Sequence, residues 1–232
     1  LWHRSGHYDN YKDLMYFFTS CDSQMCVRPM NCPGSILLYN QRPRSYKELP
    51  LRLAEFGLVH RYELSGVMHG LFRVRSFTQD DAHIYCMPEQ IEDEISSLLS
   101  LADKIYRAFN FTEIKIAVST RPEKSIGSQE LWDRATQALI NALEKNKRPF
   151  VIQEGEGAFY GPKIEIKIED ALGRSWQCGT IQVDFFQPEN FDLHFIDAAQ
   201  QRHRPVIIHQ ALFGSLERFI GIILEHLKGH LP

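Results

Sequence analysis

The chain has 232 residues, of which 44% are hydrophobic and 24% charged, and its formal net charge is −3. This composition is typical of one large globular domain or of a main domain with a small insertion, and it excludes a global basic field for nucleic acid. No apolar run approaches the roughly 20 residues of a membrane-spanning helix, so we expect no membrane partner.

The five cysteines stand at positions 21, 26, 32, 86 and 178. An odd number without regular spacing argues against a disulfide framework and for a reducing compartment, so we expect a cytoplasmic protein, although an organellar form also fits. No CxxC pair is present, so any metal site must be assembled from distant residues. The chain begins with Leu1 and shows no signal peptide, and we therefore expect an excerpt from a longer protein.

The first part of the chain reads as a loop followed by hairpins and short strands. Its expected elements are a loop over 1–14, a hairpin over 15–29, a tight turn over 31–34, a helix around 36–38, and strands over 51–61, 72–78 and 82–86.

The second part adds helices to further strands. Its expected elements are helices over 88–109, 128–146 and 214–227, and strands over 113–119, 150–153, 163–169, 174–186 and 206–209. The strands are too often joined as hairpins for a doubly wound sheet, and neither GxGxxG nor a P-loop is present. We predict an α+β fold, a mainly antiparallel sheet flanked by helices.

The stretch from His60 to His83 is the most informative one. It reads HRYELSGVMHGLFRVRSFTQDDAH and predicts two antiparallel strands joined by a long polar loop, with Arg61 and Arg73 close together. The guanidinium group of an arginine can bind two phosphate oxygens at once. Two neighbouring arginines therefore suit a polyanion such as a triphosphate. A solvated basic strand face is the plainer alternative.

Taken together, the motifs resemble the class II aminoacyl-tRNA synthetases, and among them the threonyl group. The segments that carry this resemblance are 6–11 (GHYDNY), 28–34 (RPMNCPG), 60–63 (HRYE), 73–75 (RVR), 77–83 (FTQDDAH), 119–123 (STRPE), 154–163 (EGEGAFYGPK), 177–180 (QCGT) and 214–219 (GSLERF). The resemblance covers essentially the whole chain and implies a catalytic domain over 1–232. It implies the activation of threonine by ATP and its transfer to the 3′ adenosine of a tRNA.

The resemblance also assigns roles to residues of the ATP site. Arg61 would bridge the amino-acid carboxylate and the α-phosphate, Arg73 would hold the γ-phosphate, and Arg218 would lie over the adenine. Phe77 would stack on the other adenine face and Glu63 would contact its edge, with Mg²⁺ accompanying the ATP. Gln177 and Thr180 would contact the nucleotide, although strand alternation places these two on opposite faces.

The resemblance further implies one Zn²⁺ held by Cys32, His83 and His209. A thiolate and two imidazoles are good zinc ligands, and three protein ligands leave a coordination position open. Each of the three residues would by itself also fit an ordinary buried core position.

Other residues are expected around the amino acid. Alternation places Gln79 and Asp81 on the strand face of His83, where Asp81 could accept the hydrogen of the threonine hydroxyl. Tyr160 and Lys163 would contact the substrate. His7 would help to deprotonate the tRNA ribose hydroxyl, the alternative being a loop histidine exposed to solvent.

The sequence departs from the pattern at Ser35, Tyr62 and Leu64, and we expect these changes to tune the site. The first class II motif, the editing region and the anticodon-binding domain should lie outside this chain. We expect the parent protein to be a homodimer, but dimerisation cannot be assumed for this chain. Three other readings are a seryl or prolyl relative, a synthetase-like module that has lost catalysis, and a structural domain stabilised by zinc.

Overall fold

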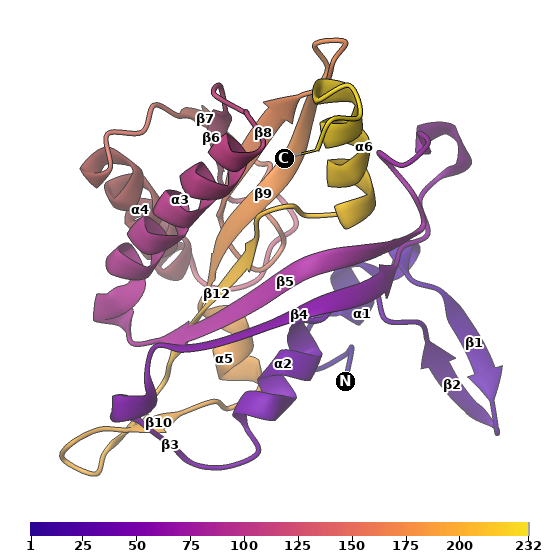
Figure 1. Ribbon diagram of the computed structural model, residues 1–232. Coiled ribbons are helices and arrows are strands. Elements are labelled where there is room, and N and C mark those ends of the chain that lie inside the picture. Colours follow the sequence, from indigo (N-terminus) through magenta and orange to yellow (C-terminus); the bar gives the residue numbers. More distant parts are fainter. Residues whose placement is uncertain (232) are drawn as a thin grey trace.

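A seven-stranded sheet forms the centre of the computed structural model, which describes residues 1–231 (Figure 1). The strands run in the order β4-β5-β12-β9-β8-β6-β7, and every neighbouring pair is antiparallel except β6 and β7. Their bounds are β4 Leu51–His60, β5 Ser76–Cys86, β6 Lys115–Ser119, β7 Val151–Gln153, β8 Lys163–Glu169, β9 Ser175–Asp184 and β12 Val206–Ala211. The predicted α+β fold with a mainly antiparallel sheet is confirmed.

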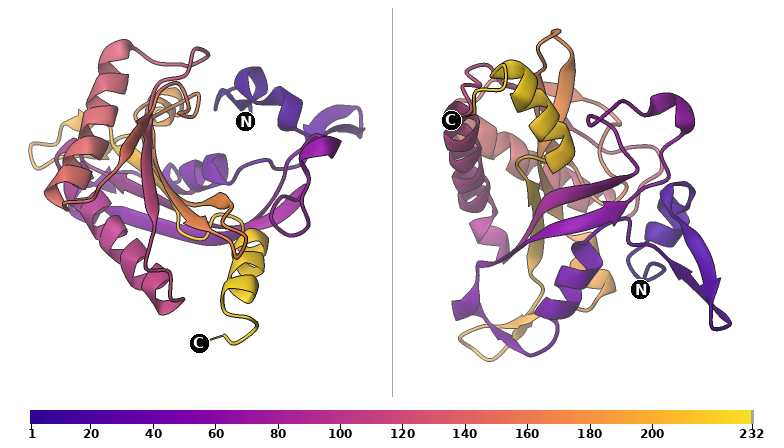
Figure 2. Two further views of the ribbon diagram at one scale, coloured as in Figure 1. Left: turned by 90° about the horizontal axis from the view of Figure 1, so that it is seen from above. Right: turned by 45° about the vertical axis from the view of Figure 1, so that its right-hand side comes forward.

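Three helices cover one face of this sheet. They are α3 (Ile91–Ala108), α4 (Gln129–Lys145) and α6 (Leu216–His226), and Figure 2 shows α3 and α4 side by side on that face. The apolar stripe of α3, which includes Ile95 and Leu99, packs with the apolar strand residues in one large core. Ser128 caps α4 by accepting a hydrogen bond from the backbone of Leu131.

The opposite face of the sheet is only partly covered, by α2 (Cys32–Tyr39) and α5 (Phe186–Asn190). Tyr85 of β5 and Ile207 of β12 enter a second, smaller core there. Because side chains alternate along a strand, His83 and His209 project to the same side as these two residues. The second core therefore lies next to His83 and His209 on the same face of the sheet.

Smaller elements complete the chain. They are α1 (His7–Asn10), β1 (Phe17–Ser20), β2 (Ser23–Cys26), β3 (Arg44–Ser45), β10 (Phe195–Ile196) and β11 (Arg202–His203). The predicted hairpin of β1 and β2 is confirmed and extends away from the sheet (Figure 1). In residues 1–231, no helix combines the length and the apolar character needed to cross a bilayer.

The structure corrects three local predictions. Residues 1–14 contain helical turns, and the expected turn over 31–34 is the beginning of α2, in which Pro33 occupies the first turn. The expected strands over 72–78 and 82–86 are one strand, β5, which begins at Ser76. Polar residues interrupt the apolar pattern of β5 because they face a cleft, while β4 pairs with it at ten positions and keeps the backbone extended.

Candidate functional site

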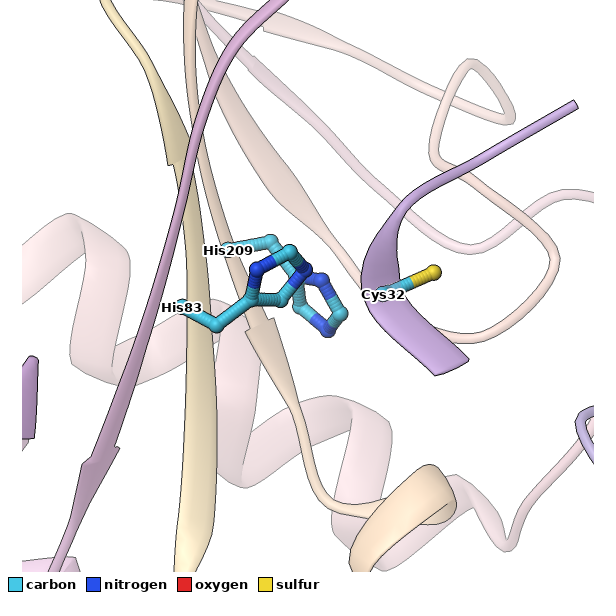
Figure 3. Close-up of side chains that lie close together, drawn as sticks. All are labelled: Cys32, His83 and His209. Atoms are coloured by element: carbon cyan, nitrogen blue, oxygen red, sulfur yellow. The ribbon is translucent and has the colours of Figure 1, made fainter. Parts of the chain in front are cut away.

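Cys32, His83 and His209 meet on the partly covered face of the sheet, where α2 packs against β5 and β12. Cys32 begins α2, and the two histidines are direct partners on β5 and β12 (Figure 3). One ligand atom from each of the three residues lies within 4.8 Å of the other two, and the imidazole centroids are 4.9 Å apart. All three are buried. The structure thus brings together the predicted zinc ligands from three distant parts of the chain.

The chemistry of this cluster fits a metal ion. Burial lowers the pKa of His83 to about 4, so the ring is held in the neutral form that a metal binds. Its Nε2 atom has no hydrogen-bond partner within the described part of the chain, although it is buried. Burial raises the pKa of the Cys32 thiol, so a thiolate there needs a cation beside it. A zinc ion would bind this Nε2 atom of His83 and would supply the positive charge that a Cys32 thiolate needs.

A cavity of about 260 Å³ opens over the cluster. Alternate residues of β5 line it with Gln79 and Asp81 beside His83, as predicted. Asp81 accepts a hydrogen bond of 2.9 Å from Asn31, and its other oxygen lies 3.8 Å from Nε2 of His83. Tyr160 and Lys163 also line this cavity, which we call the metal cavity.

A second cavity of about 170 Å³ lies beside the metal cavity and is lined by all three predicted arginines, Arg61, Arg73 and Arg218. Glu63 and Phe77 line it as well, as the predicted nucleotide site requires. We call it the arginine cavity. Arg61 lines both cavities and therefore lies at the boundary between them.

Contacts within the protein hold the guanidinium groups in place. Arg73 forms an ion pair of 2.9 Å with Glu63. Arg218 donates 2.7 Å hydrogen bonds to the carbonyl oxygens of Phe72 and Gln177, and its guanidinium lies 5.4 Å from the ring centroid of Trp176. The contacts of Arg218 with two backbone carbonyl groups fix the orientation of its planar donors.

A β-bulge corrects the expectation that Gln177 and Thr180 face opposite sides. The register between β8 and β9 shifts at Ile166 and Lys167, where Ile166 pairs with Gly179 but Lys167 pairs with Gln177. The extra residue reverses the alternation, so both side chains point the same way and form a 2.9 Å hydrogen bond with each other. Both line the two cavities.

His7 is fully buried, so the alternative of a solvent-exposed loop histidine is wrong. Its Nδ1 atom lies 2.7 Å from the Ser5 hydroxyl, and its Nε2 atom lies 3.9 Å from Sγ of Cys32. Burial, followed by the nearby His209 and Arg61, lowers its pKa to about 4. It stands behind Cys32 and is not among the residues that line either cavity.

Sequence reasoning missed several residues of the metal cavity, among them Met30, Gln182 and Gln210. Gln182 lies opposite His209 across the β9–β12 pair and donates a 2.9 Å hydrogen bond to the carbonyl oxygen of Gly161. The alternation that starts at Thr180 could have found it, because Thr180 and Gln182 stand two residues apart in one strand.

The family model of the tRNA synthetase class II core domain (G, H, P, S and T) matches residues 16–227. The chain belongs to this class II core-domain family. Threonine–tRNA ligases are its similar relatives: that of Carboxydothermus hydrogenoformans is 58% identical and that of Campylobacter curvus 59% identical over the whole chain. The RNA-binding domain of threonyl-tRNA synthetase from Cryptosporidium parvum Iowa II, a crystal structure, superposes with a TM-score of 0.95 at 47% identity, covering 100% of this chain and 58% of that one.

These findings confirm the resemblance to the threonyl group of class II synthetases. The chain spans 36% of the length of the Carboxydothermus relative and 38% of the length of the Campylobacter relative. Its matched region includes Cys32, His83 and His209, both cavities and the strands that carry them.

Proposed function

We propose that residues 1–232 form the catalytic domain of a threonine–tRNA ligase. The observation that carries this proposal is the adjacency of two sites: a buried Cys-His-His cluster and a cavity lined by three arginines, which share Arg61. The first site suits the amino and hydroxyl groups of an amino acid, and the second suits a triphosphate.

In the activation step, the carboxylate of threonine attacks the α-phosphorus of ATP in line and pyrophosphate leaves. Two anions must approach each other, so positioned cations are the main catalytic device. Arg61 would neutralise both reactants because it lines both cavities. Arg73 would bind the γ-phosphate, and Mg²⁺ would accompany the nucleotide.

The adenine would occupy the arginine cavity. Arg218 and Phe77 would cover its two faces, and Glu63 would contact its edge. Gln177 and Thr180 would contact the nucleotide from the bulged part of β9.

Threonine would occupy the metal cavity. Zinc held by Cys32, His83 and His209 would supply an open coordination position for the amino and hydroxyl groups of the substrate. Asp81 would accept the hydroxyl hydrogen, while Gln79, Tyr160 and Lys163 would line the rest of the substrate. Valine has the shape of threonine without its hydroxyl, and an apolar pocket separates such isosteres by only roughly 10²-fold, whereas a site that requires an oxygen ligand can do better.

For the transfer step we propose His7 as the group that helps to deprotonate the ribose hydroxyl. Because His7 is buried behind Cys32, this role requires the segment 1–14 to rearrange when the acceptor end of the tRNA binds. Replacing His7 with alanine should then slow transfer to tRNA and leave adenylate formation intact. We further propose a homodimeric parent protein and a cytoplasmic or organellar location.

The test is amino-acid-dependent exchange of pyrophosphate into ATP by the full chain loaded with zinc. Threonine should support exchange, and the efficiency of exchange with valine should be lower by more than about 10²-fold. A folded, zinc-loaded chain that exchanges no pyrophosphate with any amino acid would point instead to a module that has lost catalysis.

A further inference from the structure

Asp184, the last residue of β9, is a fully buried carboxylate whose two oxygens serve different parts of the fold. Its Oδ2 atom lies 2.9 Å from Nε2 of His209. Its Oδ1 atom accepts hydrogen bonds from the backbone N–H groups of Phe186 and Gln187, at 2.8 and 2.9 Å. The carboxylate thus connects a proposed zinc ligand to the start of α5.

The bond to His209 decides where the ring carries its proton. A carboxylate only accepts, so Nε2 of His209 must donate, and in the neutral ring the lone pair is then on Nδ1. Only a nitrogen without a proton can bind a metal ion, and the partner of the other nitrogen sets which one that is. Asp184 therefore presents His209 in one tautomer.

The bonds to α5 reach a second proposed ligand. Gln187 is fully buried, and its Nε2 atom lies 3.9 Å from Sγ of Cys32, a distance compatible with a weak N–H···S bond. Its Oε1 atom has no partner in residues 1–231, so the amide is held by its donor side and by its backbone. Since Asp184 anchors the backbone of Gln187, it also fixes the amide that faces the thiol.

We infer that Asp184 is a positioning residue of the metal cluster, which selects the metal-binding tautomer of His209 and, through Gln187, orients a donor toward Cys32. This inference rests on the proposed zinc site. Outer partners of this kind commonly contribute about 10–100-fold to metal affinity.

The test compares the zinc affinity of the full chain and of Asp184→Asn by competition with a chelator. An asparagine can still accept from α5 through its oxygen, but its NH₂ group would donate to Nε2 of His209 and drive the ring proton to Nδ1. We expect Asp184→Asn to bind zinc about 10–100-fold more weakly, and Gln187→Leu to show a smaller loss.

Asp80→Asn is the matched control. Asp80 is also a carboxylate that accepts backbone N–H bonds, from Leu212, Phe213 and Gly214, but it contacts none of the three proposed ligands. This variant should keep the zinc affinity of the unmodified chain to within about twofold, which distinguishes the role of Asp184 from a general effect of losing a capping carboxylate.

Nitrogen NMR of ¹⁵N-histidine in the unmodified, metal-free chain gives a readout that needs no variant, and we expect His209 to carry its proton on Nε2. The same measurement on folded Asp184→Asn should find the proton on Nδ1. A proton on Nδ1 in the unmodified chain, or unchanged zinc affinity in Asp184→Asn, would overturn the inference and leave the proposed function standing. Failure of the unmodified chain to bind zinc would instead contradict the proposed zinc site itself.

Discussion

The metal cavity and the arginine cavity share Arg61 but are built in opposite ways. In the metal cavity, the three proposed ligands Cys32, His83 and His209 are at most 7% exposed and belong to the packed core of the sheet face. The arginine cavity is formed in part by the segment between β4 and β5, where the side chain of Arg73 is 45% exposed and is paired with Glu63.

This difference suits the two ligands of the proposed function. Selection of a small amino acid requires ligands held to a fraction of an ångström, which a packed core supplies. A triphosphate brings a large charge of its own and can compete with Glu63 for the guanidinium of Arg73, whose side chain is partly exposed. We expect changes at the metal cavity to alter substrate choice, and changes at the arginine cavity to alter ATP binding and rate.

Replacement of the shared residue should have the largest effect. In the proposed function, Arg61→Ala would remove a cation aimed at the developing charge on the α-phosphate, and loss of one such group costs about 10²–10³-fold in kcat. Threonine-dependent pyrophosphate exchange measures this loss. Arg107→Ala, at the exposed end of α3, is the control and should exchange at the normal rate. An Arg61→Ala chain that keeps its kcat and changes only KM would remove Arg61 from the chemical step.

Acid should destabilise the metal side of the chain when zinc is absent. Burial lowers the folded-state pKa values of His7 and His83 to about 4, below the ordinary value of 6.5. The unfolded chain then binds more protons than the folded chain between these values, so the free energy of unfolding should fall as the pH drops from about 6.5 to about 4. Urea unfolding of the metal-free chain across this range measures the fall.

Zinc should raise the free energy of unfolding across this range without removing its fall, because a ligated His83 stays unprotonated in the folded chain while the unfolded chain still takes up a proton. If the free energy of unfolding of the metal-free chain were constant from pH 6.5 to 4, neither histidine would be buried in the neutral form.

A smaller effect is expected at Trp176, whose ring lies under the guanidinium of Arg218. A cation–π contact of this kind contributes about 0.5–2 kcal/mol, so Trp176→Leu should raise KM for ATP by roughly 2- to 30-fold while KM for threonine stays constant. Trp176→Phe keeps an aromatic face and should lie close to the unmodified chain. Equal effects of the two replacements on ATP binding would show that the ring face does not matter.

The sequence predicted the parts of the site that repeat regularly along a strand or belong to a recognisable motif. Gln79, Asp81 and His83 share a face because alternation along β5 is unbroken, and the three metal-cluster residues were found through the family resemblance. Alternation failed at Gln177 and Thr180 because a bulge lies between them, and Gly179, a glycine inside the strand, was the local signal for it.

Contacts between distant segments could not be predicted. The burial of His7 depends on Met30 and Phe159, which are remote in the sequence, and the contact of Gln187 with Cys32 joins residues 155 positions apart. Such partners are decided by how α1, α2 and α5 pack on the sheet, and composition and periodicity carry no information on that packing.

The measurement that tests the central claim most directly is the zinc content of the purified chain, with Cys32→Ala beside it. The proposed function predicts one zinc per chain, absent from the variant, because the thiolate is one of only three protein ligands. A freshly prepared, folded chain without zinc, or a Cys32→Ala chain that retains it, would contradict the proposal that Cys32, His83 and His209 form the site that selects threonine.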